Sequence, residues 1–124
     1  MLVHERVTEQ VIGAAIRVHR ALGPGLLESA YETCLAHELA QQSLSFERQV
    51  EIPIVYEGCS LDCGFRIDLL VQDKVVVELK AVGKLMPIHE AQLMTYLRLS
   101  GKKVGLLINF NVLRLKDGIM RRVL

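Results

Sequence analysis

The sequence has 124 residues, of which 51% are hydrophobic and 23% charged, so we expect one globular domain over residues 1–124 with a single core. No apolar run approaches the roughly 20 residues that cross a bilayer, and the charged N-terminus lacks the layout of a secretory signal, so we expect no membrane contact and a cytoplasmic location. The formal net charge of +1 argues neither for nor against a nucleic-acid partner.

Two helices are expected in the first third of the chain. Residues 4–21 carry apolar side chains at helical spacing, and the Gly-Pro-Gly sequence at 23–25 ends this helix. A second helix follows at 26–42, with Glu28 at its N-terminal end. We assign the Gly-Pro-Gly turn and Tyr31 to architecture, because the turn brings Glu28 toward the sheet. The expected inward stripe of the second helix consists of Leu27, Tyr31, Cys34, Leu35 and Leu39.

The rest of the chain alternates between strands and one helix. Residues 46–58 alternate with period two and predict a strand, in which Pro53 indicates an edge or an irregularity. The later elements are strands at 65–71 and 75–82, a helix at 87–101, a strand at 103–110 and a hairpin around Asp117-Gly118. The order helix-helix-strand-strand-strand-helix-strand-strand predicts an α/β (or α+β) fold, with helices packed on a mixed sheet.

The predicted hairpin between residues 65 and 82 carries charges inside otherwise apolar strands. With a three-residue turn, antiparallel pairing places Asp68 opposite Glu78 and Arg66 opposite Lys80. Alternation along the strands puts these four charged residues on one face of the hairpin. The other face is expected to be core and consists of Ile67, Leu69, Val71, Val75, Val77 and Leu79.

This pattern of charges has two interpretations. Carboxylates about 5 Å apart on neighbouring strands repel each other, so a cation between Asp68 and Glu78 would stabilise them. Mg²⁺ or Mn²⁺ suits the position, because these ions prefer carboxylate, carbonyl and water oxygens. Lys80 could then hold a nucleophilic water or offset charge on a phosphate. Alternatively, Arg66 and Lys80 form ion pairs with the carboxylates, each worth at most about 1 kcal/mol. Spacing alone does not separate the two.

Cysteines and basic residues leave further alternatives open. Cys59 and Cys63 could chelate a metal, but no second Cys/His pair follows at zinc-site spacing, so reduced thiols are the better interpretation. Either His19 or His89 could act as an acid or base near neutral pH. The C-terminal quarter is rich in basic residues, which form either a solvated surface or phosphate contacts. These are Arg98, Lys102, Lys103, Arg114, Lys116, Arg121 and Arg122.

Asp68 followed by Glu78-Leu79-Lys80 resembles the core motif of the PD-(D/E)xK nuclease superfamily. The resemblance implies that Asp68 and Glu78 bind Mg²⁺ and that Lys80 assists the attack of water on a phosphodiester. It also implies that Glu28, on the first core helix, brings another acidic group to the metal. The Leu79 side chain faces the core, but its backbone carbonyl is a further candidate ligand.

Two more motifs support the resemblance. Gln92 and Tyr96 are similar to the QxxxY motif of RecB-type members, and their four-residue spacing places both on one helical face. The stretch Gly25-Leu-Leu-Glu28-Ser-Ala-Tyr31 resembles the signature of the small GxxExxY proteins. The resemblance covers nearly all of the chain. It implies a restriction-endonuclease-like core, α-α-β-β-β-α-β-β, with a central mixed sheet flanked by helices.

The resemblance implies a Mg²⁺- or Mn²⁺-dependent nuclease that acts on DNA or RNA, with Gln92 and Tyr96 supporting substrate placement. The alternative is a catalytically silent nucleic-acid-binding or protein-interaction module on the same fold. The presence of Asp68, Glu78 and Lys80 together favours the enzyme. A homodimer is a further expectation, because a minimal nuclease core often completes its substrate groove by dimerising.

Overall fold

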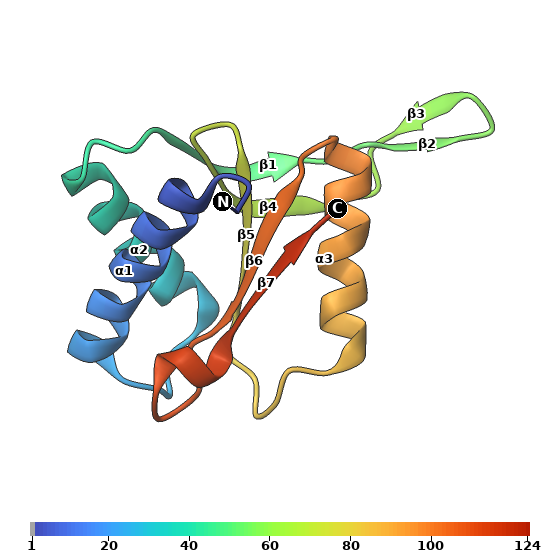
Figure 1. The fold of residues 1–124 in the computed structure, drawn as a ribbon. Helices are drawn as coiled ribbons and strands as arrows, with labels where there is room; N and C mark the ends of the chain where they lie inside the picture. Colours follow the sequence, from blue (N-terminus) through green and yellow to red (C-terminus); the bar gives the residue numbers. More distant parts are fainter. Residues whose placement is uncertain (1) are drawn as a thin grey trace.

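A five-stranded mixed sheet forms the centre of the computed structural model, which describes residues 2–124 (Figure 1). The strands stand in the order β1-β4-β5-β6-β7. Neighbouring strands are antiparallel except β5 and β6, which are parallel and are joined through a helix. Their bounds are β1 Phe46–Glu51, β4 Arg66–Val71, β5 Val75–Lys80, β6 Val104–Asn109 and β7 Ile119–Val123.

Helices cover both faces of this sheet. Helices α1 (Glu5–Leu22) and α2 (Glu28–Gln41) pack on one face, and α3 (Pro87–Ser100) packs on the other, as Figure 1 shows. Because β5 and β6 are buried on both faces, they read as nearly continuous apolar runs. Gly105 in β6 allows α3 to approach closely, since a Cβ there would lie 2.7 Å from Cδ1 of Leu93.

Tyr31 fixes the connection between α1 and α2. Its hydroxyl donates a hydrogen bond to the Gly23 carbonyl at 2.6 Å and accepts one from the Leu26 amide at 3.1 Å. Its ring stacks on that of Phe110, with centroids 4.4 Å apart. The expected architectural role of Tyr31 is therefore confirmed, and the residue links the turn to the sheet. Leu27, in contrast, does not belong to the inward stripe, because it precedes the first turn of α2 and is 77% exposed.

A small hairpin projects from the body of the protein (Figure 1). It consists of β2 (Ile54–Tyr56) and β3 (Cys59–Leu61), joined by a turn at residues 57–58 in which both φ angles are positive. The prediction of one strand over 46–58 is therefore wrong. Strand β1 ends at Glu51, and Pro53, which has no N–H to donate to a ladder, lies where the chain leaves the sheet.

The element order agrees with the sequence-based prediction once this hairpin is set aside. One further correction concerns Asp117-Gly118, which is not the turn of a local hairpin. These residues end a 3₁₀ helix, η1 (Leu115–Gly118), and β7 pairs with β6 instead. Glycine is required at 118 for another reason, because a Cβ there would overlap the Asn109 carbonyl oxygen. Over residues 2–124, no helix is both long and apolar enough to span a membrane.

Candidate active site

Strands β4 and β5 separate at the end that carries the acidic residues. Their Cα pairing runs from Val71 and Val75 to Leu69 and Val77 and then stops. Beyond this point β4 pairs only with β1, whereas β5 continues beside β6 as far as Lys80. The register agrees with the predicted one, but a gap opens between the two strands where the ladder would have continued.

The carboxylates of Asp68 and Glu78 lie in this gap. Asp68 Oδ2 accepts a hydrogen bond from the Leu79 amide at 2.8 Å, and Glu78 Oε1 accepts one from the Asp68 amide at 3.3 Å. Each carboxylate therefore bonds to the backbone of the opposite strand, and Glu78 is only 5% exposed. The structure thus brings together the two acidic residues on which the predicted metal site depends.

The ion pairs of the alternative interpretation do not form. Arg66 pairs instead with Asp62 at 3.3 Å, and the pairing of β4 with β5 stops before it would bring Arg66 opposite Lys80. Within residues 2–124, neither Asp68 nor Glu78 has a salt-bridge partner. The charged face is also less extensive than predicted, because Leu70 and Val76 pack under α3 on that side. Ile67 joins this second cluster rather than the core beneath α1 and α2.

The electrostatic state of the pair follows from its burial. Desolvation raises the pKa of Glu78 from 4.5 to about 9, and the charge of Asp68 and a hydrogen bond with its side chain add to the increase. At neutral pH the pair therefore retains a proton. The buried Glu78 carboxyl and the half-buried Asp68 carboxylate have the donor chemistry that suits a divalent cation, and Mg²⁺ is commonly bound through one or two carboxylates plus waters.

Lys80, Gln92 and Tyr96 lie together beside this pair. Lys80 Nζ donates a hydrogen bond to Gln92 Oε1 at 3.2 Å, which joins the end of β5 to α3. Burial raises the pKa of the Tyr96 phenol, and the nearby charges of Glu78 and Asp68 raise it further. These three side chains help to line a groove of about 520 Å³, together with Phe65, Ile88, His89, Ala91 and Thr95.

Within residues 2–124, Glu28 forms no three-residue cluster of potential ligands with the carboxylate pair. It is the exposed first residue of α2, and no group of three His, Cys, Asp or Glu side chains within residues 2–124 lies close enough to hold a metal. The role of Glu28 as a ligand stays a prediction. The same holds for the Leu79 carbonyl, although the buried Leu79 side chain does face the core as expected.

The family follows from comparison with known proteins. A family model described as the PD-(D/E)XK nuclease superfamily matches residues 5–123. The chain belongs to this superfamily. Its three helices and mixed five-stranded sheet are consistent with the restriction-endonuclease-like core. No curated protein and no solved structure matches the chain.

The sequence patterns did not indicate a role for three residues, which are Gln49, Glu32 and Asn109. Gln49, on β1, donates from Nε2 to Glu32 Oε1 at 2.6 Å and to Asp68 Oδ1 at 3.3 Å. The third is the buried Asn109, whose side chain bonds to both the amide and the carbonyl of Val82, at 3.0 and 2.9 Å. It fastens the segment after Lys80 to the end of β6. The sequence did hold one signal for Asn109, because a polar residue at the end of an otherwise apolar strand is unusual and indicates a specific contact.

The two histidines have structural contacts. His19 is buried, and its ring lies 2.7 Å from the Val112 carbonyl, which ties α1 to the segment after β6. His89 Nδ1 accepts a hydrogen bond from the Met86 amide at 2.9 Å and caps the start of α3. Of the two, only His89 lines the groove beside Lys80. The three cysteines are free thiols, and Cys34 is partly buried whereas Cys59 and Cys63 are exposed.

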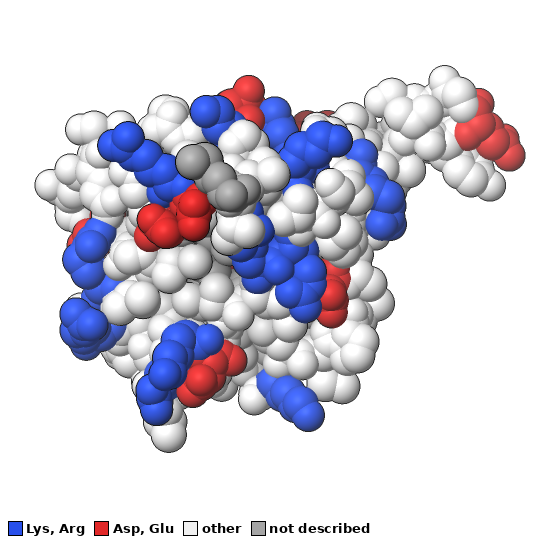
Figure 2. All heavy atoms as spheres, in the orientation of Figure 1, with Lys and Arg blue, Asp and Glu red and all other residues white. Residues whose placement is uncertain are grey.

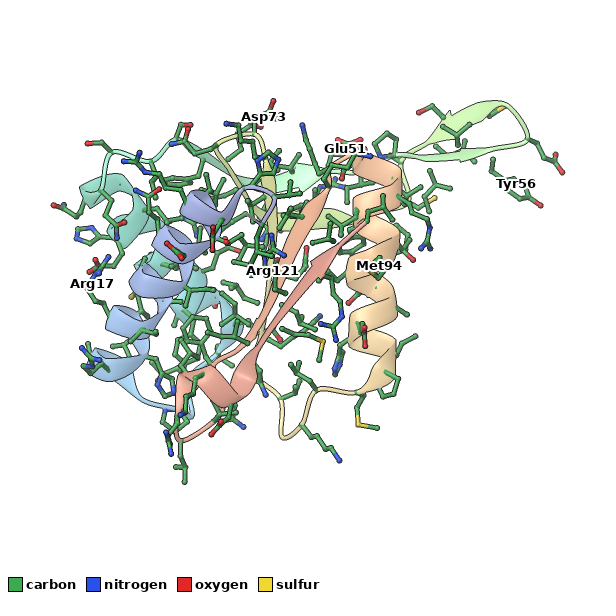
Figure 3. The ribbon with its side chains drawn as sticks, viewed as in Figure 1. Arg17, Glu51, Tyr56, Asp73, Met94 and Arg121 are labelled. Atoms are coloured by element: carbon green, nitrogen blue, oxygen red, sulfur yellow. The ribbon has the colours of Figure 1, made fainter. Side chains whose placement is uncertain are left out.

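Several C-terminal basic residues already have partners. Arg122 pairs with Glu90 at 2.5 Å, and Lys102 pairs with Asp73 at 3.0 Å. Arg121 extends from β7 toward the N-terminal segment, where it donates to the Val3 carbonyl (Figure 3). In Figure 2, Lys and Arg side chains gather over the middle of the face that β7 crosses in Figure 1. These pairs favour a structural role for part of the basic set.

Proposed function

We propose that the protein is a Mg²⁺- or Mn²⁺-dependent nuclease that hydrolyses phosphodiester bonds of nucleic acid. The observation that carries this proposal is the pair of Asp68 and Glu78, whose carboxylates each accept a hydrogen bond from the backbone of the opposite strand. The pair lies in the gap between β4 and β5 beside Lys80. Membership of the superfamily supports the same reaction class. The absence of salt bridges to the pair within residues 2–124 removes the main structural explanation for these charges.

Asp68 and Glu78 would hold the cation, with the Leu79 carbonyl and Glu28 as additional candidate ligands. The ion would supply positive charge to the phosphate and lower the pKa of the attacking water. Because the unliganded pair retains a proton at neutral pH, cation binding requires Glu78 to release it. The affinity for the cation should therefore increase with pH.

The remaining side chains would orient the substrate. Lys80 would hold the attacking water or offset the negative charge that develops on the phosphate, and its contact with Gln92 directs the ammonium toward the groove. The raised pKa of Tyr96 keeps its phenol protonated, so it can donate a hydrogen bond to a phosphate oxygen. The groove along α3 provides space for the nucleic-acid strand beside these groups.

The finer assignments belong to the same proposal. The stretch from Gly25 to Tyr31 supports membership of the GxxExxY group, and residues 1–124 would form one domain in the cytoplasm. The substrate is DNA or RNA, and a homodimer would extend the groove. The projecting hairpin is a poor candidate for contacts with phosphates, because residues 49–65 contain no Lys or Arg.

Cleavage by a Lys80→Ala variant tests the proposal. Labelled single- and double-stranded DNA and RNA are incubated with Mg²⁺ or Mn²⁺, and EDTA serves as the metal-free control. We expect metal-dependent cleavage by the wild type and a loss of about 10²–10⁴-fold in the variant, because a positioned catalytic group is removed. Lys84→Ala, an exposed lysine in the segment after β5, is the matched control and should retain activity.

The possible outcomes separate the enzyme from its alternative. Metal binding without cleavage of any substrate would contradict the nuclease and favour the catalytically silent module. Equal activity of the Lys80→Ala variant and the wild type would contradict the role of Lys80 while leaving the enzyme intact.

A further inference from the structure

We propose that Gln49 is a positioning residue, which holds the Asp68 carboxylate in the orientation that binds the cation and is itself oriented by the buried Glu32. This inference rests on the proposed function and adds two residues to it. Neither residue belongs to the Asp-Glu-Lys motif or to the QxxxY motif.

The amide of Gln49 has only one workable orientation. Glu32 carries a carboxylate, which accepts hydrogen bonds but donates none, so it selects the NH₂ end of the Gln49 amide. The second N–H of the same group then reaches Asp68 Oδ1. A flipped amide would place its carbonyl oxygen against two carboxylates. Glu32 therefore determines which group Gln49 presents to Asp68.

Both oxygens of Asp68 are held as a result. Oδ1 accepts from Gln49 at 3.3 Å, and Oδ2 accepts from the Leu79 amide at 2.8 Å. A carboxylate that is hydrogen-bonded at both oxygens cannot rotate freely. The lone pairs that remain for a cation therefore have a fixed orientation. Hydrogen bonds of this kind to a ligating carboxylate orient it for the metal, and their loss typically weakens metal binding by about 10–100-fold.

Glu32 is suited to this task because it is buried and anchored. It is 8% exposed, its Oε2 accepts a hydrogen bond from Arg48 Nε at 3.0 Å, and Arg48 Nη2 lies 2.9 Å from the same oxygen in a salt bridge. The charge of Arg48 compensates for the burial of the carboxylate, which leaves Oε1 for Gln49. The chain of contacts thus runs from α2 through β1 to Asp68 on β4.

The backbone of Gln49 is strained in a way that a plain strand residue would avoid. Its φ is +52°, in the left-handed region, although it lies within β1. The Cα pairs of β1 and β4 include Arg48 with Leu69 and Val50 with Ile67, but not Gln49 with Asp68. Strain of this kind persists where the surrounding structure requires it and is common at functional sites.

Gln49→Gly tests the inference, because it removes the amide and also relieves the positive φ. Gln72→Gly is the matched control, since Gln72 has a φ of +56° in the turn between β4 and β5 and makes no side-chain hydrogen bond to Asp68. The affinity for Mn²⁺ is measured by calorimetry, and the thermal stability of each metal-free variant is measured alongside it.

We expect Gln49→Gly to bind Mn²⁺ about 10–100-fold more weakly than the wild type, with a melting temperature that changes little, because relief of the positive φ offsets the lost hydrogen bond to Glu32. Gln72→Gly should bind Mn²⁺ like the wild type. Glu32→Gln, which removes the group that selects the amide orientation, should weaken Mn²⁺ binding in the same direction.

The outcomes distinguish this inference from the proposed function. If the wild type binds Mn²⁺ and Gln49→Gly binds it equally well, the positioning role is wrong and the metal site stands. If Gln49→Gly loses affinity only in proportion to a loss of folded protein, Gln49 is a structural residue. If the wild type binds no Mn²⁺, the proposed metal site fails, and the role of Gln49 fails with it.

Discussion

Glu78 is the residue whose environment departs furthest from that of an exposed carboxyl. Its side chain is buried in the gap between β4 and β5, next to a second carboxylate, and it has no salt bridge within residues 2–124. A purely structural carboxylate in this position would be costly, because burial disfavours its charged form. The divalent cation that we propose would give this arrangement a function.

The raised pKa of Glu78 predicts how stability depends on pH. Between about pH 4.5 and 9 the folded protein holds a proton that the unfolded chain has released, so the free energy of unfolding should decrease as pH rises. The contribution of Glu78 to this slope is at most about 1.4 kcal/mol per pH unit. The stabilisation that comes from the protonated Glu78 carboxyl is present in full below pH 4.5 and is lost as pH approaches 9.

Urea unfolding at several pH values in EDTA measures this dependence. Glu78→Gln, which keeps the shape but cannot ionise, should be relatively more stable at high pH, so the difference between variant and wild type should grow from pH 5 to 9. A constant difference over this range would show that Glu78 does not hold a proton in the folded state.

At the scale of elements, the connection between α1 and α2 depends on the Tyr31 hydroxyl. Tyr31→Phe keeps the ring stacked on Phe110 but removes the hydrogen bonds to Gly23 and Leu26. We expect a loss of about 1–3 kcal/mol in the free energy of unfolding, because two part-buried hydrogen bonds are lost and each is worth about 0.5–1.5 kcal/mol. Urea unfolding gives this value directly.

Tyr56→Phe provides the control for that measurement. Tyr56 lies on the projecting hairpin, away from the body of the protein (Figure 3), and is 63% exposed. Its substitution should change stability by no more than about 0.5 kcal/mol. Equal effects of the two substitutions would contradict the role assigned to Tyr31.

Local patterns predicted most elements, and the failures have physical causes. Helix α3 begins at Pro87 and ends before Gly101, as helix-terminus chemistry indicates. The alternation at 46–58 suits a sheet strand and a projecting ribbon equally well, because period two says nothing about which neighbours the strand has. The Asp117-Gly118 pair is a turn signal, but the glycine is needed for its close approach to Asn109.

At the scale of the whole molecule, the site combines motif residues with residues from outside the motif. Asp68, Glu78 and Lys80 were predictable because two paired strands bring them together whatever covers the sheet. The contact of Gln49 with Asp68 was not, because it depends on a left-handed backbone and on the packing of α2 near β1. Neither feature leaves a periodic signal in the sequence.

The central claim is that Asp68 and Glu78 together bind a divalent cation, and calorimetric titration with Mn²⁺ tests it most directly. The wild type, Asp68→Asn and Glu78→Gln are compared, with Asp73→Asn as the control, because Asp73 is an exposed acidic residue in the turn of the same hairpin. We predict that the wild type and Asp73→Asn bind Mn²⁺ equally, with an affinity that rises with pH. Both site variants should lose more than the roughly 10–100-fold expected from a supporting contact. Absence of Mn²⁺ binding by the wild type at millimolar metal, or equal binding by all four proteins, would contradict the account.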